Sequence, residues 1–269
     1  MDLQTPINQG SKSYKMYSKR LEKLGITKIE DFLFHIPFRY EDYSLVSQID
    51  KLQAGETVTV RGIIEDIKTL YTRKWKTIQK AVVKDETGTI DVLWFNQAFL
   101  TRVLKKGDEI SLSGKVGLDK NKLILQSPDY EVIYNNKTIH TGRLVPVYPE
   151  TKGISSKWLR RQIFNILEAK NLPSDYLPKE ILSENDLISL TDALKKIHFP
   201  KTLDDAEKAR QRLSFDELFQ IQLSSLFRKK LWEKEKIKKP WDLNKFAKQI
   251  EDFTKKIPFE LTDAQKKAV

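Results

Sequence analysis

The clearest structural pattern in this sequence is TIDVLWFNQAFL, Thr89–Leu100. Read at a period of two, Ile90, Val92 and Trp94 fall on one face of an extended segment. One coherent apolar face is typical of a strand that is half-buried in a sheet. Phe95 falls on the opposite, less certainly buried face.

The residues after this strand predict a helix. Asn96 is a good helix N-cap, and we expect the helix to cover about residues 97–104. Phe99 follows Phe95 by four residues, so two aromatic rings can project from one strand-to-helix corner. In the alternative, which stays open at this point, Phe95 belongs to the core or packs against Leu100, with Phe99 beneath it.

Further strands are predicted on both sides of this one. The first alternates through Val58, Val60 and Ile64, with Gly62 where a small barrel needs a bulge or a sharp bend. The other expected strands are Trp75–Lys84, Glu109–Val116 and Lys122–Ile133, with turns at Asp85–Gly88 and Asp119–Asn121. Five strands with one helix between the third and the fourth is the order of an OB-fold, which commonly binds oligonucleotides; a generic small barrel is the alternative.

Helical patterns flank the predicted barrel. Two short helices joined at Gly25 are expected within Tyr14–Tyr43, and Pro37–Ser44 is expected to be an irregular connection. Such a helix pair is either a small packed cap or a clamp on a nucleic-acid backbone. The later helices are predicted at about residues 156–170, 187–197, 203–213, 215–236 and 243–256. The expected fold class is α+β: a helical N-terminal cap, a five-stranded OB-fold barrel and a mainly helical linker region.

Two candidate N-terminal caps predict separate helices in the later part of the chain. Thr202 with Asp205, and Ser214 with Glu217, have the spacing of N-terminal caps, so Leu203–Leu213 and Phe215–Lys236 are predicted as separate helices.

Composition narrows the class of protein. The 269 residues include no cysteine, which excludes disulfides and thiolate metal sites, and the three histidines, His35, His140 and His198, are too scattered to suggest a metal site. No apolar run approaches the length of a membrane span, and we expect a cytoplasmic protein.

The net charge of +11 favours binding to polyanions, although a basic, solvated surface is the plain alternative. The candidate phosphate contacts on the barrel are Arg61, Lys68, Arg73, Lys74, Lys76 and Lys80.

We find no catalytic set. The nearest approach to a phosphate-binding loop, Gly10–Ser13, lacks the upstream glycine and the adjacent Gly-Lys that such a loop needs. The chain is therefore interpreted as a binding protein, with no cofactor or metal of its own.

Six collinear motifs resemble the N-terminal part of the RecG family of bacterial branched-DNA helicases. They are LGITKIEDFLFHIPFRYEDYS (Leu24–Ser44), VLWFNQAFL (Val92–Leu100), PVYPETKG (Pro146–Gly153), IHFP (Ile197–Pro200), ARQRLSFDELFQIQL (Ala209–Leu223) and PFELTDAQ (Pro258–Gln265). Two departures are visible: Ala98 and Phe99 stand where the family often has Pro-Tyr, and the family's Gly-Val-Gly-Pro hairpin is represented only by Gly10–Ser13.

The resemblance implies a wedge domain that binds replication forks and Holliday junctions, in a nucleoid-associated bacterial enzyme of DNA repair and recombination. Family aromatics that stack on bases at the branch fall on Phe95 and Phe99. The implied regions are 1–50 (cap), 51–140 (OB-fold wedge), 141–257 (helical linker) and 258–269 (start of the motor).

The resemblance also gives Gln265 the position of an adenine-reading glutamine, although Thr262 and Gln265 equally form a capping box that needs no nucleotide. The chain ends at Val269 before any Walker motif, so we expect no enzyme activity from it alone; ATP, Mg²⁺ and the C-terminal motor domains belong to the full-length family. Other open functions are a stand-alone OB-fold protein that coats single-stranded nucleic acid and a module whose barrel binds protein.

Overall fold

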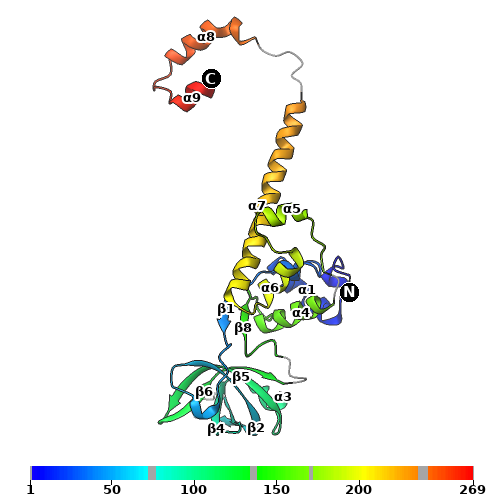
Figure 1. Cartoon of the computed structure of the whole chain (residues 1–269), viewed down its shortest axis with the longest axis vertical. Helices are drawn as coiled ribbons and strands as arrows, with labels where there is room; N and C mark the ends of the chain where they lie inside the picture. The colour runs from blue at the N-terminus through cyan, green and yellow to red at the C-terminus, as the bar shows by residue number, and fades with distance from the viewer. Residues whose placement is uncertain (1, 72–76, 134–137, 170–171, 236–241, 269) are drawn as a thin grey trace. The chain divides into compact units, whose positions relative to one another are not determined.

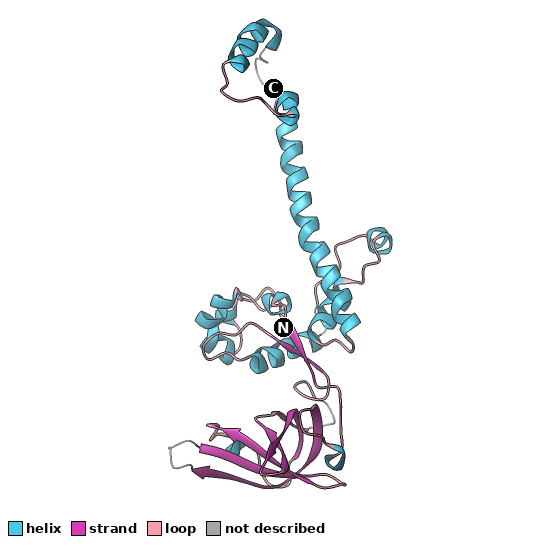
Figure 2. Cartoon of the chain, turned by 90° about the vertical axis from the view of Figure 1, so that its left-hand side faces the viewer, coloured by secondary structure: helices cyan, strands magenta, loops and turns pink. Residues whose placement is uncertain are grey.

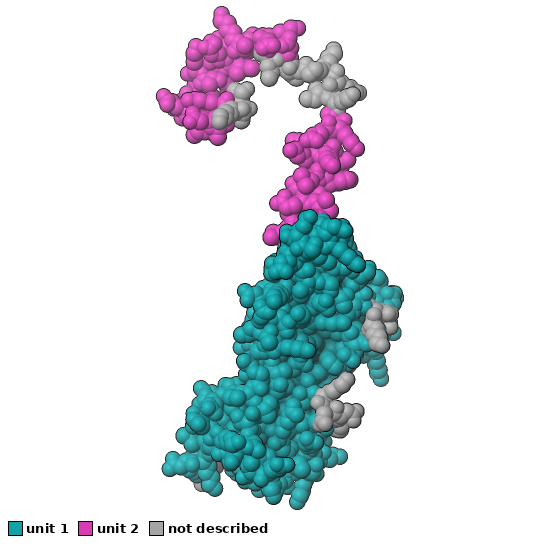
Figure 3. Space-filling view, viewed as in Figure 1, with its two compact units in different colours: residues 1–216 teal, residues 217–269 magenta. Residues whose placement is uncertain are grey.

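The computed structural model describes residues 2–71, 77–133, 138–169, 172–235 and 242–268. These residues form two compact units, Met1–Asp216 and Glu217–Val269 (Figure 3). The first unit contains a β-barrel and a helical part, which are coloured differently in Figure 2. The start of the predicted second strand, including Trp75, lies outside the described residues.

The barrel has the predicted OB-fold topology (Figure 1). Its strands are β2 (Thr57–Tyr71), β3 (Thr77–Lys84), β4 (Thr89–Phe95), β5 (Glu109–Asp119), β6 (Lys122–Gln126) and β7 (Asp129–Val132). They are ordered β2-β3-β4-β6-β5-β7, and an additional β2–β5 pairing closes the barrel. The β4–β6 pair is parallel and the other pairs are antiparallel. Helix α3 (Leu100–Val103) lies between the third and fourth strands of the barrel, as predicted.

Strand β4 alternates as its sequence predicts. Ile90, Val92 and Trp94 are buried in the barrel core together with alternate residues of β2, β3 and β5. The Trp94 indole N–H donates to the carbonyl of Pro128 at 2.9 Å, so this large ring is buried without an unsatisfied donor. The barrel core is therefore built from the inward face of each strand.

The corner after β4 differs from the prediction. Asn96 has a left-handed backbone (φ 55°) and is not a helix cap; its N–H donates to the carbonyl of Thr77 at 2.8 Å, which ends the β3–β4 ladder. Helix α3 begins only at Leu100, so the expected helix over residues 97–104 is shorter than predicted. Asn is one of the few residues that tolerate the left-handed region, so it fits this corner as well as it fits a cap.

Two details of the other strands also differ. The predicted last strand is two strands, because Ser127 adopts a positive φ of 47° between β6 and β7. The β-bulge lies between Ile64 and Asp66 rather than at Gly62. Gly62 has another role: a Cβ there would lie 2.5 Å from the carbonyl oxygen of Lys84, so the glycine lets β2 and β3 approach closely.

The helical part of the first unit has its own core. Its elements are the 3-10 turns Ile7–Gln9 and Glu22–Leu24, and helices α1 (Lys12–Leu21), α2 (Asp31–Phe34), α4 (Ser156–Glu168), α5 (Lys179–Glu184) and α6 (Leu190–His198). A third 3-10 turn, Ile49–Lys51, belongs to the barrel, because Ile49 is buried in the barrel core. Residues from α1 and α2 share one buried cluster with residues from α4 and α6. Gly25, with φ 77°, ends the first helical segment as predicted.

Two predictions in this part are wrong. Residues 37–44 are not an irregular connection, because β1 (Arg39–Asp42) pairs with β8 (Leu144–Val147) in a separate two-stranded sheet. The predicted helices over residues 203–213 and 215–236 are one helix, α7 (Leu203–Lys234), so Ser214 is not a cap. The Thr202 cap is confirmed, since its hydroxyl accepts from the Asp205 N–H at 3.2 Å. Helix α5 was not predicted from the sequence.

The second unit contains the C-terminal part of α7 together with α8 (Leu243–Lys255) and α9 (Asp263–Ala268). The capping box before α9 is confirmed: the Thr262 N–H donates to Gln265 Oε1 at 2.9 Å, and the Gln265 N–H donates to Thr262 Oγ1 at 3.4 Å. Among the described residues, we find no helix with the length and apolar character of a membrane span.

Candidate nucleic-acid interface

Phe95 lies on the outer face of the barrel. The register places it opposite Ile78 on β3, and Ile78 lies opposite Leu70 on β2, so three adjacent strands contribute one apolar row. The side chain of Phe95 is 39% exposed and that of Leu70 is 41% exposed. These exposures exclude the alternative in which Phe95 belongs to the barrel core. The apolar row also includes two residues, Ile78 and Leu70, that the sequence did not single out.

Phe99 is exposed at the same corner. It is the residue immediately before α3, its side chain is 51% exposed, and its neighbour Leu100 is fully buried. Leu100 therefore anchors the corner to the core and leaves Phe99 outside. Among the described residues, the rings of Phe95 and Phe99 make no ring contact with each other. The corner thus presents two separate aromatic surfaces.

Two of the predicted cations lie beside this apolar row. Lys68 on β2 is directly opposite Lys80 on β3. This pair lies two residues along the strands from the Leu70–Ile78 pair, and it is therefore on the same outer face. Each has a carboxylate partner: Lys80 Nζ is 2.6 Å from Asp91, and Lys68 Nζ is 3.2 Å from Asp66. Both pairs are at least partly exposed, so a phosphate can compete with the carboxylate at little cost.

The remaining predicted cations are placed differently. Arg61 lies at the other end of β2, opposite Ser111, and does not join Lys68 and Lys80. Arg73, Lys74 and Lys76 fall in the segment between β2 and β3 that lies outside the described residues.

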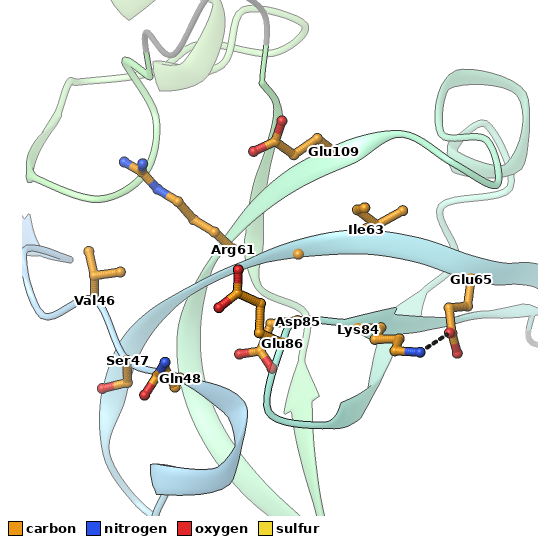
Figure 4. Close-up of a pocket in the computed structure, with 11 residues that line it drawn as sticks. Val46, Ser47, Gln48, Arg61, Ile63, Glu65, Lys84, Asp85, Glu86 and Glu109 are labelled. Carbon is orange, nitrogen blue, oxygen red and sulfur yellow. Dashed lines mark ion pairs between the residues drawn. The ribbon is translucent and has the colours of Figure 1, made fainter.

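A cavity of about 670 Å³ opens on the barrel near Arg61 (Figure 4). Its lining includes four carboxylates, those of Glu65, Asp85, Glu86 and Glu109. Glu65 pairs with Lys84 at 3.4 Å, and Arg61 extends away from that pair. Because Lys84 is separated from Ile78 by about 20 Å along β3, this cavity is distinct from the Phe95 face. Its acidic lining disfavours phosphate.

Buried charges connect the barrel to helix α4. Lys157 Nζ donates a hydrogen bond to the backbone carbonyl of Tyr130 on β7 and lies 3.7 Å from the centre of the Tyr130 ring. Burial lowers the pKa of Lys157 to about 8. Arg160 donates to the carbonyl of Pro146 at 2.9 Å and lies 2.9 Å from His140 Nδ1. The Lys157 contact joins barrel strand β7 to α4, whereas Arg160 joins α4 to β8 and to the segment that leaves the barrel. Nothing in the sequence pattern pointed to these contacts.

Glu131 joins the same network from β7. Its carboxylate accepts the N–H groups of Ile139 and His140, both at 2.8 Å. Charge-assisted bonds of this kind fix the segment that leaves the barrel.

The three histidines contact protein groups. His35 lies 3.1 Å from the carbonyl of Pro149, His140 contacts Arg160, and His198 lies between the Tyr148 hydroxyl and the carbonyl of Leu33, at 2.9 Å from each. In the part of the chain that the structure describes, no three His, Cys, Asp or Glu residues come close enough to hold a metal ion.

Comparisons with known proteins agree with this architecture. Residues 10–169 match the family model described as the RecG wedge domain. The ATP-dependent DNA helicase RecG of Thermotoga maritima is 35% identical over 283 residues, and that of Synechocystis is 31% identical over 285 residues. Each alignment covers 100% of this chain but 34% of the relative, so the chain spans about a third of the length of these curated relatives.

A solved structure of RecG bound to a three-way DNA junction is also similar. Its TM-score is 0.69 at 31% identity, and the alignment covers 100% of this chain and 36% of the other. The family match extends over more than half of the residues and includes the barrel, the Phe95 corner and helix α4. The chain therefore belongs to the RecG wedge-domain family.

Proposed function

We propose that this chain is the wedge region of a RecG-like helicase and binds branched DNA, either a replication fork or a Holliday junction. The family match supports the proposal, as does the similarity to a RecG structure that contains a three-way DNA junction. In the full-length protein, this region would bind the branch while a motor moves the duplex, in the repair and recombination of stalled forks.

The exposed ring of Phe95 is the observation that carries this proposal. OB-folds bind oligonucleotides on the outer face of their second and third strands, which here are β3 and β4. Phe95 lies on that face with Ile78 beside it. Stacking on an aromatic ring is tolerant of sequence, which suits a protein that acts at branches in any sequence. We assign Phe99 a second stacking surface at the same corner.

Basic side chains supply the phosphate contacts in this proposal. Lys68 and Lys80 are next to the apolar row, and the proposed path also includes Arg73, Lys74 and Lys76. Arg61, at the other end of β2, is proposed as a separate phosphate contact away from this path. Each contact with a phosphate releases counterions, so binding should weaken steeply with salt.

The other assignments follow from the family. We propose that residues 1–50, 51–140, 141–257 and 258–269 act as cap, wedge, linker and start of the motor. ATP and Mg²⁺ would act in the motor domains that follow, with Gln265 near the adenine. We propose no catalytic activity for this chain alone, and a location in the bacterial cytoplasm at the nucleoid.

Replacing the rings tests the site. We expect Phe95→Ala to lower fork affinity about 5- to 100-fold, because one stacked base contributes about 1–3 kcal/mol. Binding to linear duplex and the melting temperature should hardly change, since the side chain is outside the core. Phe99→Ala should act in the same direction and more weakly. Fork affinity is measured by gel shift or fluorescence anisotropy at fixed salt.

Val103→Ala is the matched control. Val103 is an exposed apolar side chain on α3, so its loss removes surface at the same corner without removing a ring. An unchanged fork affinity for folded Phe95→Ala protein, or an equal loss in Val103→Ala, would remove the stacking assignment.

A second function, coating of single-stranded DNA, is supported by the OB-fold topology alone. A chain with this function would bind single strands at least as tightly as forks.

A further inference from the structure

Helix α1 carries a row of lysines on its solvent-facing side. Lys12, Lys15 and Lys19 lie in α1, and Lys23 lies in the 3-10 turn that continues it; all four are exposed. Their spacings of three and four residues place them on one face, with neighbours about 5 to 6 Å apart along the axis. We call these four residues the α1 lysine stripe. The opposite side of the helix buries Tyr14 and Leu21 in the core.

The α1 lysine stripe lacks the carboxylate partners that neutralise the charge of several other lysines in this unit. Lys28, Lys196 and Lys208 each form an ion pair with a nearby carboxylate, whereas no described residue forms one with the stripe. Like charges four residues apart destabilise a helix. The first turn of α1 also contains no acidic residue, so Lys12 faces the positive end of the helix dipole. The stripe therefore costs stability in the free protein.

Arg20 extends this positive surface and is held in place. Its guanidinium lies against Gly153: a Cβ on that glycine, which has φ 82°, would be 2.4 Å from Arg20 Nη1. On another side, the guanidinium is 5.6 Å from the ring of Tyr17, which packs edge-on against Trp158. Arg20 is exposed, and among the described residues no carboxylate pairs with it. A positioned guanidinium with free donors suits a phosphate.

The chemistry of the stripe indicates duplex rather than single-stranded DNA. From Lys12 to Lys23 the exposed side chains are the four lysines, Arg20, Met16 and one carboxylate, Glu22, so the stripe offers an excess of cations without a ring on which an unpaired base could stack. The nearest ring, Tyr17, is occupied by Trp158 and Arg20. The stripe from Lys12 to Lys23 is about 16 Å long, long enough to follow several phosphates of one strand.

We propose that the α1 lysine stripe and Arg20 bind the phosphate backbone of a duplex arm of the branched DNA, as a second contact surface separate from the Phe95 corner. The inference rests on the proposed function, because the duplex is an arm of the same branch.

The salt dependence of binding tests this surface. The test variant combines Lys15→Gln, Lys19→Gln, Arg20→Gln and Lys23→Gln, which keep helix propensity and remove like-charge repulsion, so the chain should fold and melt no lower than the original. The slope of log affinity against log salt should fall by about 2 to 4 for a fork and for linear duplex, because each lost phosphate contact removes about 0.9. Binding to single-stranded DNA should change less.

A control variant distinguishes an effect of this particular surface from a general effect of lowering the net positive charge. Lys179→Gln, Lys195→Gln and Lys201→Gln remove exposed cations outside α1 and should leave the slope nearly unchanged. The proposal would be overturned if the folded test variant kept the salt slope of the original chain. It would also be overturned if the salt slope fell equally in the control variant.

The outcome is separable from that of the Phe95 test. If the original chain binds forks and Phe95→Ala weakens that binding, while the α1 variant keeps its salt slope, only the second surface is refuted. If the original chain shows no fork preference but the α1 variant loses duplex affinity, the fork-binding function fails and the α1 surface stands.

Discussion

A buried histidine gives the residue-scale prediction on pH. His198 is fully buried; the Tyr148 hydroxyl donates to its Nδ1, and its Nε2–H donates to the carbonyl of Leu33. This arrangement fits the neutral ring, and burial lowers the pKa of His198 to about 4. Because the folded pKa is below the unfolded one, the stabilising effect is present above about pH 6.5 and is lost as the pH falls through about 4.

We therefore expect the free energy of unfolding to fall between pH 6.5 and 4, by up to about 3 kcal/mol from this group. Urea unfolding at several pH values measures how the free energy of unfolding depends on pH, and His198→Gln should reduce that dependence. Burial also lowers the pKa of His35 and His140, so part of the dependence should remain in that variant. A folded-state titration of His198 near pH 6.5, observed by NMR, would contradict the account.

The position of Phe95 shows how far single residues could be predicted from the sequence. The alternation of Ile90, Val92 and Trp94 predicted that Phe95 faces outward, and its exposure confirms this. Its neighbours Ile78 and Leu70 could not be predicted, because the register of β2, β3 and β4 is not visible in any one strand. Asn96 was predicted wrongly because asparagine favours both helix caps and the left-handed region.

At the scale of elements, local sequence patterns predicted the wrong structure where contacts with residues elsewhere in the chain determine it. Ser214 has the spacing of a cap, yet α7 continues through it, and Arg212 before the expected break forms an ion pair with Asp216 after it. Its guanidinium binds Asp216 at 2.9 Å and Asp175 at 2.8 Å, and all of it is buried. Strand β1 was missed for a similar reason, since its partner β8 is about a hundred residues away in the sequence.

The β2–β3 contact at Gly62 gives the element-scale prediction. An alanine methyl there would lie 2.5 Å from the Lys84 carbonyl oxygen, which belongs to the backbone and cannot move aside easily. We expect Gly62→Ala to destabilise the barrel by about 1–3 kcal/mol, the usual cost of overpacking. Gly88→Ala is the control, because its methyl would meet Ile49 at an ordinary 3.5 Å. Equal urea midpoints for the two variants would contradict this, because they would show that β2 and β3 accommodate the methyl group without loss of stability.

At the scale of the whole molecule, the sequence predicted the fold class and the family, but not how the parts share cores. The strand and helix order identified the barrel because the OB-fold places its helix at one defined point. The N-terminal helices pack with α4 and α6, more than a hundred residues later, and no periodic pattern reports such a pairing. The second aromatic surface at Phe99 was predicted from spacing, and its role stays a proposal.

Preference for branched DNA is the central claim of this account. The most direct measurement is the affinity of the unmodified chain for a fork, a linear duplex and a single strand of matched length, at one salt concentration. We predict that the fork binds at least about fivefold more tightly than either, since one base stacked at the branch contributes about 1–3 kcal/mol. Equal affinity for fork and duplex, or tighter binding of the single strand, would contradict it.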